Sequence, residues 1–445
     1  MGSSSSIRQS RGRGGVTALS IAVAAFTAIT AAACSSSSSS TNATPGSSSS
    51  SSGSGAGGSQ TIVFAESGLG TEGQQTQKAI TAFEAANPNI KVTIQVLSSD
   101  STQYLATLEH DFITGSSTPD VFESDVTYPA KFAQAGWVMP LTSFNVDSSQ
   151  YFPHEVAAGT FNNTLYAMPW FDNPEGLYYR TDLIKTPPTS PAQVVSDAQA
   201  ALKADKSLKE GLAFEAAKYE GAITSFLTVD SAFGGTLDPT SVNTPGNVAA
   251  LGWLHDAIYK YHIAPTAVTG WQEGQVQSEF SSGYAAFSIN YPFVEAQPAA
   301  AAVKGHIGYI PFPAGTGGTP GSALGGEMLA INAKSAHAQA AWKLIQYLCS
   351  APVEVVRAIA TGDPPSLPSA YTQQLYSAAP YFQDVKTLNN YSAPRPVNPN
   401  YLQVSADLQT LFSAVYANSS SSAASQAFAA ANSAIASDAS KTPGA

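Results

Sequence analysis

Cysteine is almost absent from this sequence of 445 residues, which holds only Cys34 and Cys349. Two cysteines cannot build the disulfide framework that staples small secreted domains, so a fold held together by disulfides is excluded. Cys349 lies in the apolar helical pattern AAWKLIQYLCS, where a thiol is expected to pack as a small buried hydrophobic side chain. Cys34 lies outside any such pattern and needs a different explanation.

Charged residues are also scarce, at 11% of the chain, against about 25% in an average protein. Without the three arginines of residues 1–33, the chain holds 17 basic and 31 acidic residues, a formal charge of −14. A surface this acidic repels phosphate backbones and anionic bilayers, so neither nucleic acid nor a membrane surface is expected as the ligand. No apolar run after residue 33 approaches the length of a membrane span, so the body is expected to be soluble.

Signatures of catalysis are missing too. The chain has no GxSxG, no GxxxxGK[ST] and no HExxH, and its six histidines are scattered, so neither a metal nor a cofactor is predicted. Residues 68–73, GLGTEG, fit the GxGxxG pattern of dinucleotide-binding loops, but Glu66 and Glu72 place carboxylates where a pyrophosphate requires positive potential. We interpret the stretch as a strand-to-helix loop. A pair of glycoside-cleaving carboxylates remains open, because such pairs meet in space and leave no linear signature.

Residues 1–33 have the layout of a secretory signal: three arginines precede an uncharged, mostly apolar run that ends in three alanines. Cys34 follows at once. This arrangement resembles a bacterial lipobox, in which the cysteine is acylated and becomes the mature N-terminus, although Ala31 replaces the usual leucine. We therefore predict a lipoprotein signal peptide at 1–33 and lipidation of Cys34. An ordinary cleaved signal and a retained transmembrane anchor are the alternatives.

A linker follows the cysteine. Residues 35–59 hold fourteen serines and five glycines, with no charge and no large apolar side chain. A segment of this composition cannot bury enough surface to offset the entropy of ordering, so residues 34–59 are predicted to form a lipidated cysteine and a flexible linker. As a random coil the linker spans about 28 Å, from roughly 5–6 Å times the square root of its length.

Strands and helices alternate from Gln60 onward. Residues 61–67, 91–98 and 119–125 have the composition of strands, and helical spacing separates them at 74–87 and 104–115. Strands separated by helices of this length pair in parallel, so the body is predicted to have an α/β fold. The 386 residues from Gln60 onward are too many for one simple core and indicate two domains.

Seven segments, taken in chain order, carry a resemblance to a known family. They are FEAANPNIKVTIQV (83–96), TGSSTPDVFESDVTYPAKFAQAGWVMPL (114–141), NTLYAMPWFDNPEGLYYRTDLI (163–184), WQEGQVQSEFSSGYAAFSINYPF (271–293), GHIGYIPFPAG (305–315), LGGEMLAINAKSAHAQAAWKLIQYL (324–348) and PRPVNPNYLQVSADLQ (394–409). Together they resemble the bacterial extracellular solute-binding proteins of ABC transporters, sugar-binding class (family 1), over nearly all of residues 60–420. Within that class, the LYYRTDL and RPVNPNY segments look most like trehalose- and maltose-type binding lipoproteins.

The resemblance implies a two-lobe periplasmic-binding-protein fold of type II. Each lobe is expected to be a mostly parallel sheet flanked by helices, and the chain is expected to cross the hinge three times, near 169–173, 311–320 and 346–351. Lobe I then comprises residues 60–170 and 318–348, and lobe II comprises residues 171–317 and 349–445.

The resemblance also implies a sugar site between the lobes. A sugar presents hydroxyl groups at its rim and weakly apolar faces, so its site requires carboxylates and amides together with aromatic rings. The expected ligand-binding residues are Glu66, Asp125, Tyr128, Trp170, Asp172, Tyr291, Gly325, Gly326, Glu327 and Arg395, with Phe171 and Phe293 beside them. Trp253 and Trp271 are expected in the core, and Asp182 is expected to cap or pair near the start of a helix.

Two positions depart from the family pattern. An aromatic residue often follows the glycine pair, where this chain has Glu327, and tryptophan is often found where it has Tyr291. One stacking plane fewer and one carboxylate more favour a ligand with more donor groups, or a sugar of different length.

The implied function is capture of a neutral oligosaccharide, most like a disaccharide of trehalose or maltose type, and its delivery to an ABC import permease. The chain is then no enzyme, and is expected to act as a monomer held by its lipid anchor at the extracellular face of a bacterial membrane. The alternatives are a secreted glycan-active hydrolase that uses two of the cleft carboxylates, and a signalling partner of a membrane sensor.

Overall fold

The computed structural model describes residues 59–67, 70–99, 101–296 and 303–441. By its contacts the chain divides into two units, Met1–Ala56 and Gly57–Ala445, and all described residues belong to the second unit. The predicted signal peptide, the lipidation of Cys34 and nearly all of the predicted linker therefore lie outside the described residues. Of the helices that are described, none is both long enough and apolar enough to cross a membrane.

The first lobe begins with strands and helices in alternation. Its elements are β1 (Gln60–Glu66), α1 (Gly70–Ala86), β2 (Ile90–Val96), α2 (Ser101–Ile113), β3 (Val121–Asp125), α3 (Pro129–Gln134), α4 (Pro153–Ala158), β4 (Thr160–Phe161) and β5 (Thr164–Leu165). β1 pairs in parallel with β2 on one side and with β3 on the other. The strands and helices predicted between residues 61 and 125 are thus confirmed.

The second lobe and the C-terminal part of the chain are richer in helices. Their elements are α5 (Pro191–Ala204), β7 (Glu210–Ala213), α6 (Gly221–Asp230), α7 (Pro245–Tyr259), α8 (Glu273–Ser281), β8 (Ala285–Asn290), α9 (Phe293–Ala296), β9 (Ile307–Ile310), α10 (Ala338–Leu348), α11 (Ala351–Thr361), α12 (Gln373–Ala378), α13 (Phe382–Leu388), β11 (Ser392–Ala393), α14 (Tyr401–Tyr416) and α15 (Ala423–Ala439). The helix starts follow local chemistry. Ser190 caps α5 by accepting a hydrogen bond from the Gln193 amide, and Pro191 occupies the first turn, where its missing N–H costs nothing.

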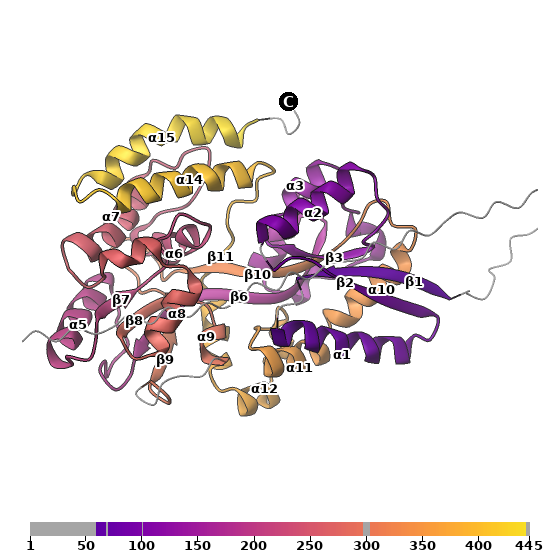
Figure 1. Cartoon of the computed structure of the whole chain (residues 1–445), viewed down its shortest axis with the longest axis horizontal. Coiled ribbons are helices and arrows are strands. Elements are labelled where there is room, and N and C mark those ends of the chain that lie inside the picture. The colour runs from indigo at the N-terminus through magenta and orange to yellow at the C-terminus, as the bar shows by residue number, and fades with distance from the viewer. Residues whose placement is uncertain (1–58, 68–69, 100, 297–302, 442–445) are drawn as a thin grey trace, which may run out of the picture. The chain divides into compact units, whose positions relative to one another are not determined.

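Two long strands, β6 (Ala167–Arg180) and β10 (Ser322–Ile331), join the lobes and run through the middle of the molecule (Figure 1). β10 pairs antiparallel with β3 of the first lobe and with β6, and β6 continues antiparallel to β8 and β9 of the second lobe. Among the described residues, nine strands form one sheet, in the order β2-β1-β3-β10-β6-β8-β7 with β11 and β9 beside this path. The predicted two-lobe α/β fold is confirmed. Parallel pairing holds for β1 with its neighbours and for β7 with β8, whereas the crossing strands are antiparallel.

A β-bulge interrupts the pairing of the two crossing strands. Glu327 lies opposite Phe171, but the next residue, Met328, lies opposite Pro169, so Trp170 is the extra residue of β6. A bulge turns its side chain away from the regular alternation of the strand. The ring of Trp170 is 2% exposed and packs edge to face against Phe64, with ring centroids 5.9 Å apart, in the core of the first lobe.

Two of the three predicted hinge crossings lie elsewhere in the structure. The first prediction, 169–173, does fall inside β6. Residues 311–320 do not cross: Gly315 and Thr319 donate backbone hydrogen bonds to the 231–232 segment of the second lobe, so the chain crosses within β10 instead. Residues 346–351 do not cross either, because α10 and α11 both pack against α1 of the first lobe. The chain returns to the second lobe after Thr361.

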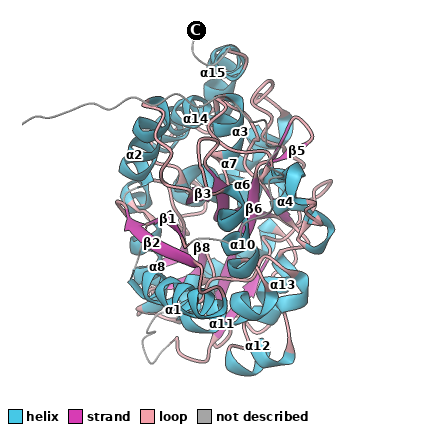
Figure 2. Cartoon of the chain, turned by 90° about the vertical axis from the view of Figure 1, so that its right-hand side faces the viewer, coloured by secondary structure: helices cyan, strands magenta, loops and turns pink. Residues whose placement is uncertain are grey.

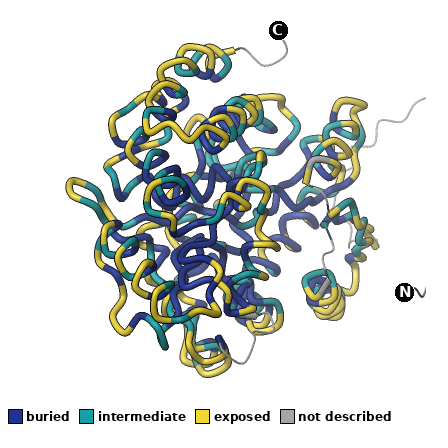
Figure 3. The backbone as a smooth tube through the Cα atoms, turned by 60° about the vertical axis from the view of Figure 1, so that its left-hand side comes forward, coloured by how far each residue is buried: buried dark blue, intermediate teal, exposed yellow. Residues whose placement is uncertain are grey.

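Helices enclose the sheet on both faces, as the end-on view in Figure 2 shows. The tube in Figure 3 is dark blue through the interior and yellow along the outer turns of the helices, so burial is concentrated on the strands and the inner faces of the helices. Cys349 is a free, buried thiol as predicted. Trp253 is buried and Trp271 packs against the same core of the second lobe, which confirms the prediction for both.

Candidate functional site

A cavity of about 380 Å³ lies between the lobes, at the carboxyl ends of β1, β2 and β3 and over the middle of β10. Its lining residues are Ser67, Ser98, Ser99, Ser101, Tyr104, Glu123, Asp125, Tyr128, Asn173, Tyr219, Glu220, Gly221, Thr224, Glu273, Tyr291, Gly325, Gly326, Glu327 and Arg395. The carboxyl ends of parallel strands are where α/β proteins commonly bind small ligands. The volume is within the range of about 300–1,000 Å³ typical of small-molecule sites.

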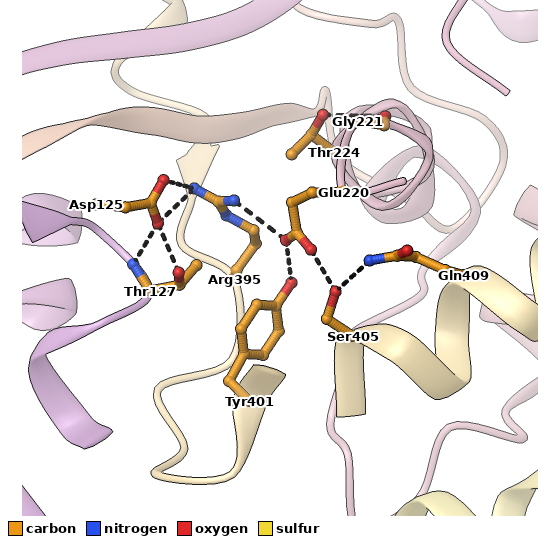
Figure 4. A network of polar contacts seen from close by, with 9 residues as sticks. All are labelled: Asp125, Thr127, Glu220, Gly221, Thr224, Arg395, Tyr401, Ser405 and Gln409. Carbon is orange, nitrogen blue, oxygen red and sulfur yellow. Dashed lines mark hydrogen bonds and ion pairs between the residues drawn. The ribbon is translucent and has the colours of Figure 1, made fainter. Parts of the chain in front are cut away.

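Arg395 joins the two lobes across this cavity (Figure 4). Its Nη2 lies 3.4 Å from Asp125 Oδ1, at the end of β3 in the first lobe, and its Nη1 donates to Glu220 Oε1 at 3.1 Å, at the start of α6 in the second lobe. The Arg395 side chain is 6% exposed, so both ion pairs are shielded from solvent on the arginine side. One cation therefore balances a carboxylate from each lobe.

Each of the two carboxylates is held by further hydrogen bonds. Asp125 Oδ1 accepts from the Thr127 amide at 2.8 Å and from the Thr127 hydroxyl at 2.6 Å. Glu220 accepts from the Tyr401 hydroxyl at 2.6 Å and from the Ser405 hydroxyl, both on α14. These contacts fix the positions of the two carboxylates, and both residues line the cavity.

The glycine pair of β10 lets the backbone approach the cavity closely. A Cβ on Gly325 would lie 2.9 Å from the ring of Tyr291, and one on Gly326 would lie 2.3 Å from the Phe171 carbonyl oxygen. Gly326 also has φ +101°, a conformation that side-chain-bearing residues rarely adopt. Only glycine fits at either position, and both glycines line the cavity together with Tyr291.

The first-lobe wall is strongly acidic. Burial, reinforced by Glu123 and Asp125, raises the pKa of Glu327 well above its usual value. Burial also raises the pKa of Glu123, and this effect is opposed by the Ser67 amide, which donates to the carboxylate at 2.6 Å. A carboxyl group that holds a proton can donate as well as accept hydrogen bonds, which suits recognition of hydroxyl groups.

The second-lobe wall carries a second group of carboxyl groups. Burial raises the pKa of Glu273, and Arg395 opposes this effect. Behind it, burial raises the pKa of Glu175 to about 8, and that of Glu215 well above its usual value, with repulsion from Glu273 and Glu175 added for Glu215. Glu175 accepts from the Thr228 hydroxyl at 2.6 Å, whereas both carboxyl oxygens of Glu215 are buried without a hydrogen-bond partner in the described chain.

Seven of the ten predicted site residues come together on the wall of this cavity. They are Asp125, Tyr128, Tyr291, Gly325, Gly326, Glu327 and Arg395. Glu66, Trp170 and Asp172 do not line it. Glu66 faces a different pocket, with Gln74 and Gln77, and burial raises its pKa to about 7.

The positions of Trp170 and Asp172 correct the prediction that they line the cleft. Trp170 is turned into the first-lobe core by the bulge, where the Arg357 guanidinium stacks 4.1 Å above its ring. Successive residues of a strand point to opposite faces. Since Asn173 lines the cavity, Asp172 faces away from it, and its side chain is 0% exposed.

Four functional candidates were missed by the sequence argument: Glu123, Asn173, Glu220 and Glu273. Glu123 precedes Asp125 by two residues and so shares its face of β3, a signal that strand alternation supplies. Glu273 lies in the WQEG segment that carried part of the resemblance. Glu220 belongs to none of the family segments and has no linear signal, because only the fold brings α6 to the cavity.

Two further expectations concern residues outside the cavity. Asp182 forms a bidentate ion pair with Arg180, at 2.7 and 2.6 Å, which confirms that it pairs. Residues 70–73 of the GxGxxG stretch belong to α1, so the predicted loop is wrong for them, and residues 68 and 69 lie outside the described residues. Among the described residues, one group of side chains has donor atoms close enough to hold a metal ion, and it lies outside the cavity, at His154, Glu155 and Asp172.

Comparisons with known proteins agree with this architecture. The family model for bacterial extracellular solute-binding proteins matches residues 67–355. A probable ABC transporter-binding protein of Deinococcus radiodurans is 30% identical over 375 residues, covering 80% of this chain and 88% of that protein. The maltose-bound structure of Thermotoga (T. maritima) MalE3 is 29% identical with a TM-score of 0.75, covering 84% of this chain and 98% of that chain. The sugar-binding protein MalE of Xanthomonas citri is 23% identical with a TM-score of 0.73, covering 85% and 98%, and shows the same fold.

Proposed function

Because the chain belongs to the family of bacterial extracellular solute-binding proteins, we propose that it captures a sugar between its lobes and delivers it to an ABC import permease. The family binds solutes and does not catalyse reactions, so the hydrolase alternative is set aside. The ligand we propose is a neutral oligosaccharide, most like a disaccharide of maltose or trehalose type. The maltose bound to the MalE3 relative supports this class.

The observation that carries the proposal is the convergence of polar groups from both lobes on one cavity. Asp125, Glu123 and Glu327 offer carboxyl groups from the first-lobe side, and Glu220 and Glu273 offer them from the second. Bidentate hydrogen bonds to carboxylates are a strong way to hold vicinal hydroxyl groups. The rings of Tyr128 and Tyr291 supply apolar faces for the sugar C–H groups.

The arginine bridge supports a mechanism of closure. Arg395 contacts Asp125 of one lobe and Glu220 of the other, so opening the lobes breaks at least one of the two ion pairs. A ligand that hydrogen-bonds to both walls adds free energy only in the closed state and shifts the equilibrium toward it. The closed, loaded protein is the form that we propose docks on the permease.

We also propose the placement that the N-terminal sequence indicates. Acylation of Cys34 would hold the chain at the extracellular face of a bacterial membrane, and the serine-rich linker would let the lobes reach the permease. The lobes would act as a monomer, with no other protein needed to complete the cavity.

A thermal-shift screen of neutral mono-, di- and trisaccharides tests the ligand class. A cognate sugar at a hundredfold excess over its Kd is expected to stabilise the protein by about 2.7 kcal/mol. Calorimetric titration of each sugar that raises the melting temperature then gives the Kd. A response to amino acids or peptides, with none to any sugar, would show that the proposed ligand class is wrong.

A matched pair of aspartate variants tests the site. Asp238 holds Thr240 through the same two hydrogen bonds with which Asp125 holds Thr127, at 2.8 Å each, but it lies outside the cavity. Asp125→Asn should weaken sugar binding at least tenfold, and Asp238→Asn should leave it unchanged. Equal sugar affinity in both variants would exclude Asp125 from the site.

A further inference from the structure

Three side chains with metal-binding atoms meet on the far side of β6 from the cavity. His154 and Glu155 come from the short helix α4, and Asp172 comes from the middle of the crossing strand. One ligand atom from each lies within 4.8 Å of the others, and His154 Nε2 is 3.6 Å from Asp172 Oδ2. The imidazole is held by stacking on Phe152, with ring centroids 5.5 Å apart.

These groups are deeply buried and unsatisfied. Asp172 is 0% exposed, Glu155 is 2% exposed and the His154 side chain is 9% exposed. Nε2 of His154, both carboxyl oxygens of Glu155 and both of Asp172 are buried without a hydrogen-bond partner in the part of the chain that the structure describes. Leaving a buried polar atom unpaired costs about 1–3 kcal/mol, and more for a charged group.

The surroundings add negative charge. The carboxyl groups of Asp172 and Glu354 both lie close enough to Glu155 to repel its negative charge. Glu354 itself shows how this region satisfies a buried carboxyl group: it accepts from the Ser366 hydroxyl at 2.6 Å and from the Leu367 amide at 3.0 Å. His154, Glu155 and Asp172 have no such donors, so they require either shared protons or a cation.

We propose that His154, Glu155 and Asp172 bind one divalent transition-metal ion, of the zinc class, as a structural cation at the hinge. One imidazole nitrogen with two carboxylates is a donor set that suits Zn²⁺ or Mn²⁺ better than Ca²⁺, which prefers oxygen alone. A dication would neutralise the two carboxylates. Ligand atoms around a tetrahedral zinc lie about 3.4 Å apart, from bond lengths of about 2.0–2.1 Å. The His154–Asp172 separation already comes near this value, and a shift of the Glu155 carboxylate completes the set.

The site's position defines what the metal does. Asp172 donates its backbone N–H to the Pro364 carbonyl, in the segment that leads to the second lobe, and its neighbour Asn173 lines the cavity. A cation that ties α4 to β6 therefore fixes the first-lobe side of the hinge, about which the second lobe turns.

The test is zinc binding by the purified full chain, without sugar, so that it is independent of the proposed function. After chelator treatment and dialysis, calorimetric titration with ZnCl₂ should show one site per chain, and zinc should raise the melting temperature. Asp172→Asn and His154→Gln should each weaken zinc binding at least tenfold. Glu354→Gln, a neighbouring buried carboxyl group outside the donor set, should bind zinc as the parent does.

Several outcomes would overturn the proposal. These are no stoichiometric zinc binding by the parent chain, equal binding by Asp172→Asn, or an equal loss in Glu354→Gln. If the Asp172 and His154 variants do not fold, the test is made on the parent chain alone, by comparing its melting temperature in zinc with that in chelator. Identical melting temperatures would mean that the cluster is satisfied by shared protons rather than by a metal.

Discussion

Two acidic clusters lie on opposite sides of β6 and balance their charge in different ways. In the cavity, Asp125 and Glu220 share the Arg395 guanidinium, at 3.4 and 3.1 Å. Behind the strand, Asp172 lies 3.6 Å from His154, and among the described residues neither Asp172 nor Glu155 forms an ion pair with a lysine or arginine. The first cluster draws its carboxylates from both lobes, so its internal cation can act as a latch that ligand and motion rearrange. The second draws its side chains from α4 and β6, and the metal ion proposed above would supply its counter-charge.

The arginine is expected to give the largest effect. Arg395→Ala leaves two partly buried carboxylates without their cation, so the free energy of unfolding should fall by about 3 kcal/mol and sugar binding should be lost. Chemical denaturation and calorimetry measure the two effects. Arg395→Lys keeps the charge but not the planar fork, so it should recover stability in part. Unchanged sugar affinity in Arg395→Ala would show that the Arg395 bridge between the lobes plays no part in sugar binding.

Gly326 lies between the two clusters, because it pairs with Asp172 across the strands and also lines the cavity. Gly326→Ala forces a Cβ against the Phe171 carbonyl at φ +101°, so we expect a loss of about 2 kcal/mol of stability and weaker binding of both sugar and zinc. The control is Gly252→Ala in α7, where nothing lies within 4 Å of the added Cβ. That change should stabilise the protein by about 0.5–1 kcal/mol. If Gly326→Ala is as stable as the control and binds sugar and zinc normally, then neither stability nor binding depends on the close approach of β6 and β10 at this position.

The pH dependence of stability tests the buried carboxyl groups on the cavity side. The pKa of Glu175 is raised from 4.5 to about 8, chiefly by burial, while the Thr228 hydrogen bond opposes the rise and Glu273 adds to it. A raised pKa means that the folded state holds a proton that the unfolded state releases, so stability falls as the pH rises from about 4.5 to 8.

In Glu175→Gln, the decrease in the free energy of unfolding over this pH range should be smaller by about 2 kcal/mol. Urea unfolding at pH 5, 6.5 and 8 measures the effect. The parent slope also contains Glu66, with a pKa of about 7, and Glu354, with a pKa of about 8, so the variant should keep part of it. Parallel curves for parent and variant would show that Glu175 is ionised in the folded state.

The smallest effect is expected at Trp170. Trp170→Phe should leave sugar affinity unchanged, because the ring lies in the first-lobe core beneath Arg357 and away from the cavity. The lost volume should lower the free energy of unfolding by about 1–2 kcal/mol. Calorimetry and denaturation of the same sample compare the two quantities. A clear loss of sugar affinity at unchanged stability would return Trp170 to the binding site.

The sequence predicted much of the fold because its signals are local. The alternation of residues 91–98 and the helical spacing of residues 104–115 depend on near neighbours, and both elements formed as expected. Site residues were predicted correctly where they end a strand, as Asp125 does, or where they lie in a family segment, as Arg395 does. The prediction failed at Trp170, because a one-residue bulge reverses the side to which a strand residue points, and no sequence signal announced the bulge.

What the sequence determined by itself is therefore the α/β pattern, the acidic and cysteine-poor character, and the family to which the segments belong. Tertiary structure alone decided which charges meet. Asp125 and Arg395 are 270 residues apart in the chain and form an ion pair, and Glu220 joins them from a helix start that no motif marks. Hydrophobic periodicity is read over a few residues, whereas the balance of buried charge depends on groups that only the folded chain brings within a few ångströms.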